Sequence, residues 1–138
     1  MKYLQDYMTE RQSAAFRKAK AFFAFSDKQL QEGLTETNQN KEDVVSMGSG
    51  LIAAKDQAST LFKELEQIYT ESIQQDIEEN GLNAIIRREL SNHEAYYTGD
   101  IESTVDALED YPVTAEDIHK VYRNRNHEVP LQRNYEHN

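Results

Sequence analysis

The segment LSNHEAYYTGD, residues 90–100, contains the side chains of this chain that are best suited to chemistry. His93 stands beside Glu94, and two tyrosines and a Thr-Gly-Asp turn signal follow. An unperturbed imidazole titrates at about pH 6.5, so a histidine next to a carboxylate can take part in proton transfer. A small enzyme, or an anion- or metal-binding protein, would use His93, Glu94, Tyr97 and Asp100.

A purely structural role also accounts for the presence of these residue types in this segment. His93 follows Leu90 at helical spacing, which places it on an apolar face, and a lone histidine there usually serves as a hydrogen-bonding core residue. In this interpretation His93, Tyr97, Gly99 and Asp100 form a corner where two helices meet. The sequence favours this structural corner, and we predict no catalytic residue.

Other chemical signatures are weak. A metal site needs three or four converging ligands, and Glu89 is the one acidic partner at helical spacing before His93. The segment SMGSG, residues 46–50, precedes a predicted helix but lacks the Gly-Lys-Ser/Thr of a phosphate-binding loop. The remaining histidines show no spacing that indicates convergence: His119, His127 and His137. We therefore expect no enzyme, no metal and no cofactor.

The charge of the chain is distributed unevenly. There are 25 acidic and 15 basic residues, a formal net charge of -10. Residues 1–28 have a net charge of +3, residues 29–117 of -15 and residues 118–138 of +2. Between Arg88 and Lys120 there are nine acidic residues and no Lys or Arg. Such a field repels the phosphates of nucleic acids and attracts basic protein surfaces.

The leading functional hypothesis follows from this charge. Carboxylates spaced along helices can imitate the phosphate rows of DNA and occupy the basic groove of an enzyme. We expect a non-enzymatic protein that binds a basic partner, such as a nuclease, without binding nucleic acid itself. A solvated acidic surface without a partner is the alternative. The predicted partner-binding residues are Glu64, Glu71, Glu78, Glu79, Glu94, Asp100, Glu102, Asp106, Glu109, Asp110, Glu116 and Asp117.

The elements that must position these residues are predicted to be helices. Apolar residues recur at three- to four-residue spacing, which predicts an all-α fold of five to six helices around one long central helix. Ser26 and Thr114 begin capping-box patterns, and Phe62 and Ile73 belong to the expected core. The segment DVVSM, residues 43–47, is the one hint of a strand. The predicted helices span residues 3–25, 27–33, 51–80, 82–97, 101–111 and 114–122.

The pattern predicts a single compact or elongated domain over residues 1–125 and a mobile tail over residues 126–138. The chain has no cysteine, so nothing indicates an oxidising compartment. Its longest apolar run, AFFAF, has five residues where about 20 would span a bilayer. The N-terminal residues lack the apolar core of a signal peptide. We expect a soluble cytoplasmic protein with no membrane partner.

Two segments of the chain resemble segments of other proteins: FFAFSDKQLQEGL and LSNHEAYYTGDIESTVDALEDYPVTAEDIHKVY. The Asn-His-Glu, the Tyr-Thr-Gly-Asp corner and the capped final helix resemble small uncharacterised helical proteins of phages and mobile elements of gut bacteria. The resemblance implies a bacterial host in which small acidic inhibitors, including anti-restriction and anti-CRISPR proteins, are common. A protein that self-associates as a homodimer through the long helix remains a further alternative.

Overall fold

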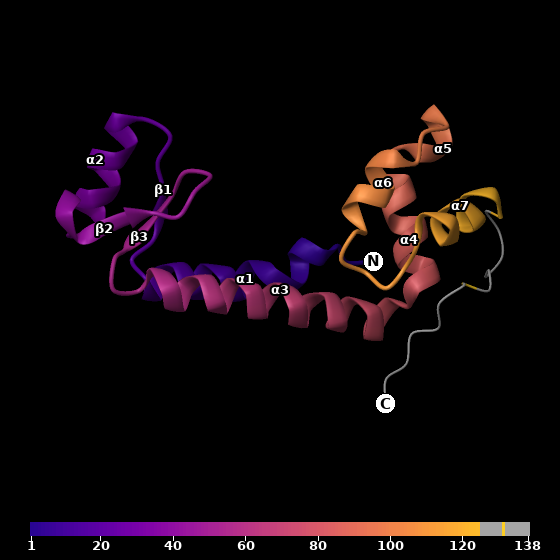
Figure 1. Ribbon diagram of the computed structural model, residues 1–138, viewed down its shortest axis with the longest axis horizontal. Coiled ribbons are helices and arrows are strands. Elements are labelled where there is room, and N and C mark those ends of the chain that lie inside the picture. The colour runs from indigo at the N-terminus through magenta and orange to yellow at the C-terminus, as the bar shows by residue number, and fades with distance from the viewer. Residues whose placement is uncertain (125–130, 132–138) are drawn as a thin grey trace. The chain divides into compact units, whose positions relative to one another are not determined.

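The computed structural model describes residues 1–124 and 131 (Figure 1). Residues 2–72 form one compact unit, and a second unit begins at Ile73. The first unit contains α1 (Leu4–Lys18), β1 (Phe22–Phe23), α2 (Asp27–Glu36), the 3-10 helix η1 (Lys41–Asp43), β2 (Val44–Ser46) and β3 (Leu51–Ala54). The long helix α3 (Ala58–Asn80) contributes residues to both units, and the second unit continues with α4 (Leu82–Asn92), α5 (Ala95–Thr98), α6 (Glu102–Ala107) and α7 (Ala115–Arg123).

Helices dominate the described residues, as the apolar spacing predicts. The expectation of a purely all-α fold is nevertheless wrong, because three short strands form an antiparallel sheet. The described part of the chain also holds seven α-helices, not five or six. The predicted helix 82–97 is split at Glu94, whose φ of 56° lies outside the right-handed helical range. The predicted tail, residues 126–138, lies outside the described residues except for position 131.

The sheet replaces parts of two predicted helices. α1 ends at Lys18, and Lys20 turns the chain with a left-handed φ of 51° before β1 begins. β1 then pairs with β3, which occupies the start of the predicted helix 51–80. The spacing of a short apolar run fits a strand as well as a buried helix, so the pairing partner decides the outcome.

The sheet has the order β1-β3-β2 and lies between two helical layers. Opposed residues share a face, so Phe22 and Ile52 lie on one side, and Leu51 and Ala53 lie on the other. The Phe22 ring packs against Gly33 of α2. Leu51 and Ala53 belong to the apolar cluster that α1 and the first part of α3 complete. The central strand β3 is thus covered on both faces, whereas the edge strands β1 and β2 keep exposed residues such as Phe23.

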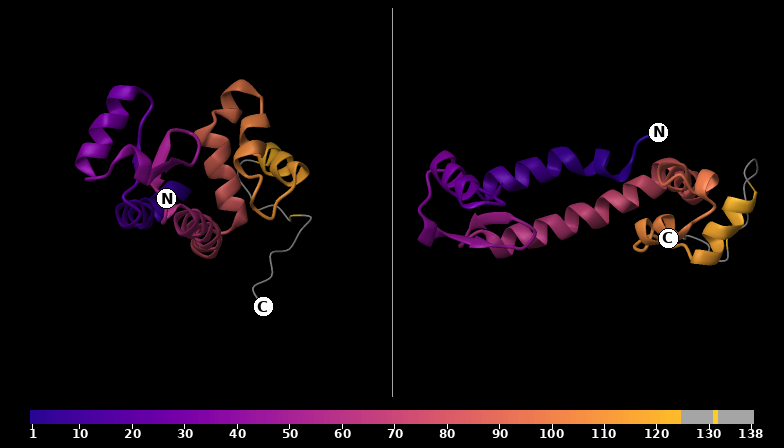
Figure 2. Two further views of the ribbon diagram at one scale, coloured as in Figure 1. Left: turned by 60° about the vertical axis from the view of Figure 1, so that its left-hand side comes forward. Right: turned by 90° about the horizontal axis from the view of Figure 1, so that it is seen from above.

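α1 and residues 58–72 of α3 run side by side in opposite directions (Figures 1 and 2). Met8 and Ala15 of α1 share the apolar cluster with Leu61 and Ile68 of α3. Phe62, which the spacing assigns to the core, is 56% exposed. The prediction for Phe62 is therefore wrong, because the buried stripe of α3 passes through its neighbour Leu61.

The second unit packs α4 to α7 and the end of α3 around its own apolar core. The largest fully buried apolar side chains of this core are Ile85, Ile86, Leu90, Leu108, Ile118 and Val121. None of the described helices, in either unit, is long and apolar enough to cross a membrane.

The predicted N-terminal caps at Ser26 and Thr114 are confirmed. Ser26 Oγ accepts a hydrogen bond from the Gln29 backbone at 3.2 Å. Thr114 Oγ1 accepts one from the Asp117 backbone at 3.0 Å, and the Asp117 carboxylate accepts one from the Thr114 backbone at 2.9 Å. These local bonds fix where α2 and α7 begin.

Candidate functional site

The segment LSNHEAYYTGD, residues 90–100, forms a tight corner in the second unit. Glu94 and Gly99 both have a left-handed backbone, with φ of 56° and 79°, and they bracket the single turn of α5. Ala95 is fully buried, and the Tyr96 ring stacks on Tyr122 of α7 with 5.5 Å between ring centroids. The packing of this corner therefore depends on Ala95 and Tyr96, two residues that the sequence pattern did not single out.

His93 is the C-terminal cap residue of α4 and is only partly buried. Its backbone N–H donates to the Glu89 carbonyl at 3.0 Å, and its Nε2 lies 3.6 Å from Glu89 Oε1. Glu94 is exposed, and Tyr97 is 89% exposed, so the Tyr97 side chain makes no buried contact in the predicted corner. The histidine thus faces the carboxylate one helical turn before it.

Asp100 has the geometry of a cap. Its Oδ1 accepts a hydrogen bond from the Glu102 backbone at 2.9 Å, and its own N–H donates to Thr98 Oγ1 at 3.1 Å. These bonds hold the turn that leads into α6. Within residues 1–124 and 131, no three His, Asp or Glu side chains come together as metal ligands would.

The predicted acidic residues divide between the two units. In residues 2–72, Glu64 pairs with Lys18 at 2.8 Å, and Glu71 pairs with Arg11 at 2.7 Å. Hydrogen bonds from Gln67 and Arg11 hold the pKa of the Glu71 carboxyl below its usual range. Both carboxylates are therefore engaged by cations on α1.

In the second unit nine of the predicted residues are exposed, and one is not. Asp117 is fully buried, where it completes the cap of α7, so the structure removes it from the predicted acidic surface. The reason is local, because the carboxylate that satisfies a capping box points back at its own helix end. The exposed residues are Glu78, Glu79, Glu94, Asp100, Glu102, Asp106, Glu109, Asp110 and Glu116.

The excess of acid is concentrated in this unit. Residues 2–72 contain nine basic and eleven acidic residues, a net charge of -2, whereas residues 73–124 contain four and twelve, a net charge of -8. Arg123 is the one exposed cation in the described part of this unit. Arg87 and Lys120 are partly buried, and Arg88 is buried against carboxylates. The exposed charge of residues 73–124 is therefore almost entirely negative.

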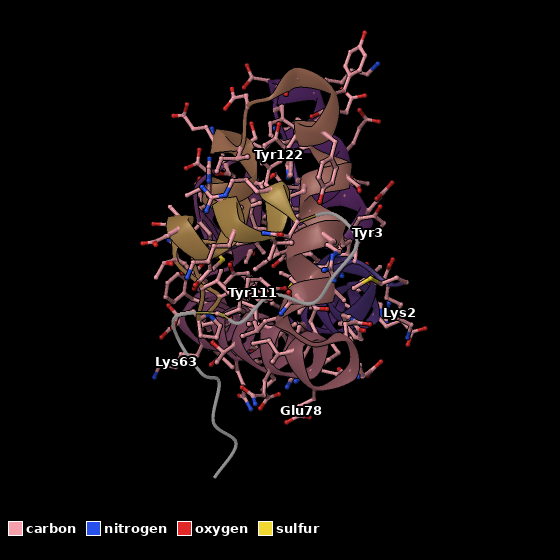
Figure 3. All side chains as sticks on the ribbon, turned by 90° about the vertical axis from the view of Figure 1, so that its right-hand side faces the viewer. Lys2, Tyr3, Lys63, Glu78, Tyr111 and Tyr122 are labelled. Carbon is pink, nitrogen blue, oxygen red and sulfur yellow. The ribbon has the colours of Figure 1, made fainter. Side chains whose placement is uncertain are left out.

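The same unit contains a buried polar network that was not predicted from the sequence. Arg88 donates from Nη1 and Nη2 to the two oxygens of Asp76 at 2.8 and 3.0 Å, and from Nε to Glu89 Oε2 at 2.6 Å. Asn80 Nδ2 donates to Asp76 Oδ1 at 2.8 Å, and Tyr111 Oη donates to Asp76 Oδ2. In Figure 3, Tyr111 lies between α3 and α7.

A signal for this network was present in the sequence. Asp76 follows Ile73 at helical spacing, and Arg88 follows Ile85 in the same way, so both charges fall on apolar faces. A buried charge is tolerated when it is paired, which makes two opposite charges on facing stripes a recognisable pattern.

The network is suited to structure more than to catalysis. Asp76 accepts four hydrogen bonds, which use its two oxygens fully and leave no lone pair for a substrate proton. Burial opposes the charge of Arg88, but its hydrogen bonds to Asp76 and Glu89 outweigh burial and raise its pKa. Burial, together with the hydrogen bond to Asp76, raises the pKa of Tyr111 above that of an ordinary tyrosine. Arg88 therefore stays charged and Tyr111 stays neutral near neutral pH.

Comparison with curated proteins and with solved structures finds no significant match. A family model described as "Family of unknown function (DUF7659)" matches residues 4–128. The matched range includes the sheet, the buried Asp76–Arg88 network and the exposed carboxylates of the second unit. Because the match spans nearly the whole chain, this protein belongs to the DUF7659 family.

Proposed function

We propose that this protein is a non-enzymatic binding protein whose second unit engages a basic partner. The observation that carries the proposal is the surface of residues 73–124, which exposes nine of the predicted carboxylates and, among the cations, only Arg123 in full. Such a surface attracts a lysine- and arginine-rich groove and raises the rate of encounter with it. The partner class that fits is an enzyme with a basic nucleic-acid-binding surface.

Two of these carboxylates are displayed on the short, well-anchored helix α6. Glu102 and Asp106 stand one turn apart on α6, while Thr104 and Leu108 of the same segment are buried. A rigid helix that presents charges at regular intervals loses little conformational freedom on binding. This arrangement supports a surface that substitutes for the phosphate backbone of a nucleic acid.

The resemblance to proteins of phages and mobile elements supplies the proposed setting. In that setting the protein acts in the cytoplasm of a bacterial host and inhibits a host nuclease, in the manner of an anti-restriction or anti-CRISPR protein. The DNA that the nuclease normally binds would then compete with this protein for the same basic groove.

The test uses purified restriction and CRISPR nucleases and measures binding at about 0.1 M and about 1 M salt, where the Debye length falls from about 10 Å to about 3 Å. The variant Glu102→Lys/Asp106→Lys reverses two charges on α6, and the control Glu32→Lys/Glu36→Lys reverses two exposed charges at the same spacing on α2. We expect salt-sensitive binding that DNA displaces and that the α6 variant loses. Absence of such binding, or equal loss in the α2 control, would count against the proposal.

A further inference from the structure

Three loops of the first unit line an open cavity of about 480 Å³, and all of its lining residues belong to residues 2–72. One wall is the end of α1 and the turn after it, the second is the segment between α2 and β2, and the third is the turn between β3 and α3. The charged and amide side chains that matter for its chemistry are Lys18, Lys20, Asn38, Glu42, Lys55 and Asp56.

Hydrogen bonds between the loops fix the shape of this cavity. Gln39 Nε2 donates to the Lys20 carbonyl at 3.1 Å and ties the second wall to the first. The Lys55 backbone N–H donates to the Asp43 carbonyl at 2.9 Å and ties the third wall to the second. The Ala54 N–H donates to the Ala19 carbonyl at 3.2 Å and closes the ring of contacts. The cavity is therefore built in advance, which reduces the entropy that a ligand must overcome.

Two lining residues adopt a backbone that side chains disfavour. Lys20 has a φ of 51° and Asn38 a φ of 54°, and both face this cavity. Asparagine tolerates the left-handed region, whereas for lysine it is uncommon and unfavourable. Backbone strain of this kind persists where the surrounding structure imposes it, and strained residues occur most often at functional sites.

The lining also holds cations without a protein partner. Lys18 pairs with Glu64, but the ammonium groups of Lys20 and Lys55 make no ion pair with any residue that the structure describes. The lining includes the carboxylates of Glu42 and Asp56 as well. A site that offers ammonium groups and carboxylates without pairing them with each other fits a ligand that carries both an anionic group and hydroxyl donors.

We propose that this cavity binds a small phosphate monoester with hydroxyl groups, of the size of a mononucleotide or a sugar phosphate. Lys20 and Lys55 hold the phosphate as point charges, while Glu42, Asp56 and the Asn38 amide accept the hydroxyls. The volume lies within the range of about 300–1,000 Å³ that is typical of small-ligand sites. Its polar lining suits a polar ligand.

The experiment titrates the full chain with AMP, ribose 5-phosphate and adenosine and follows the backbone amide resonances. The variant Lys20→Asn/Lys55→Gln removes both ammonium groups and retains a residue that accepts the left-handed backbone at position 20. The control Lys63→Gln removes an exposed lysine of α3 that does not line the cavity. A thermal melt of each variant confirms that it is folded.

We expect saturable shifts at Lys20, Asn38 and Lys55 with a phosphate probe and none with adenosine. A response to AMP alone identifies a nucleotide site, and a response to both phosphates identifies a sugar phosphate site. The double variant should weaken binding by about tenfold or more, because two charge-assisted contacts are lost, and the control should bind as wild type. No saturable shift with either phosphate, or equal weakening in the control, overturns the proposal.

Discussion

Arg88 binds Asp76 through two parallel hydrogen bonds, at 2.8 and 3.0 Å, and both side chains are buried. The guanidinium presents its donors in a fixed planar fork that matches the two carboxylate oxygens, so the pair fixes the orientation of α4 relative to the end of α3 within the second unit. Tyr111 completes the arrangement from the segment between α6 and α7. One buried carboxylate thus connects three parts of the unit that carries the acidic surface.

Removing one partner of this pair should destabilise the protein strongly. Arg88→Met leaves the Asp76 carboxylate buried without its cation, a change that lowers the free energy of unfolding by about 3–5 kcal/mol in comparable cases. Urea denaturation gives the measurement. Arg11→Met breaks the exposed pair with Glu71 and serves as the control, which should hardly move the midpoint. An Arg88→Met midpoint equal to that of the control would refute a buried role for the pair.

A companion variant separates charge from packing. Asp76→Leu combined with Arg88→Met replaces the pair by apolar side chains, and such replacements are often neutral or stabilising. We expect the double variant to recover most of the stability that Arg88→Met loses. Losses that simply add would show that the two residues act independently.

Tyr111 should make the protein sensitive to alkaline pH. Burial and the hydrogen bond to Asp76 raise its pKa in the folded state, whereas the unfolded chain ionises at the ordinary value of about 10. Above about pH 10 the unfolded state therefore binds fewer protons, and the free energy of unfolding falls as pH rises. The contribution is fully present below about pH 10.

Stability curves of wild type and Tyr111→Phe measure this effect. The variant loses the hydrogen bond, which lowers stability at pH 7 by about 1 kcal/mol, but it should decline less steeply above about pH 10. Tyr97→Phe, at a residue that is 89% exposed, should follow the wild-type curve. Parallel alkaline slopes for wild type and Tyr111→Phe would contradict the assignment.

Sequence patterns predicted the structure correctly where it depends on residues that are close together in the chain. Ser26 and Thr114 cap the helices that their patterns predict, because a capping bond joins residues three positions apart. The unequal distribution of acid is likewise a property of the sequence itself, and the exposure of Glu102 and Asp106 follows from the apolar stripe of Ile101, Val105 and Leu108 on the other face of the same helical segment.

Prediction failed where distant residues decide the outcome. The apolar spacing near Phe22 fits a helix, and only the pairing with Ile52, thirty positions later, makes it a strand. The sequence also could not show that Lys20 and Lys55 line one cavity, because the loop contacts that place them there leave no periodic pattern in the sequence. Asp117 shows the limit for surface prediction, because a capping carboxylate can be buried.

The two adjacent positions Leu61 and Phe62 test the orientation of α3. Leu61 is 2% exposed and Phe62 is 56% exposed. Leu61→Ala should therefore lower the free energy of unfolding by about 2–5 kcal/mol, as cavity-forming changes do, whereas Phe62→Ala should have a small effect. Thermal melting of the two variants provides the comparison. A larger loss for Phe62→Ala would mean that the helix is rotated from the orientation described here.

Gly33→Ala should destabilise the protein, although the same change in an ordinary helix interior gains about 1 kcal/mol. Gly33 is buried in α2, and a Cβ at this position would collide with the Phe22 ring of β1. Overpacking of this kind costs about 1–3 kcal/mol, so the collision outweighs the gain in helix propensity. In a Phe22→Ala background the ring is absent, and Gly33→Ala should become neutral or stabilising. Urea denaturation of the four proteins in this cycle measures the coupling between the two positions. A stabilising Gly33→Ala in the wild-type background would show that α2 does not pack on the Phe22 face of the sheet.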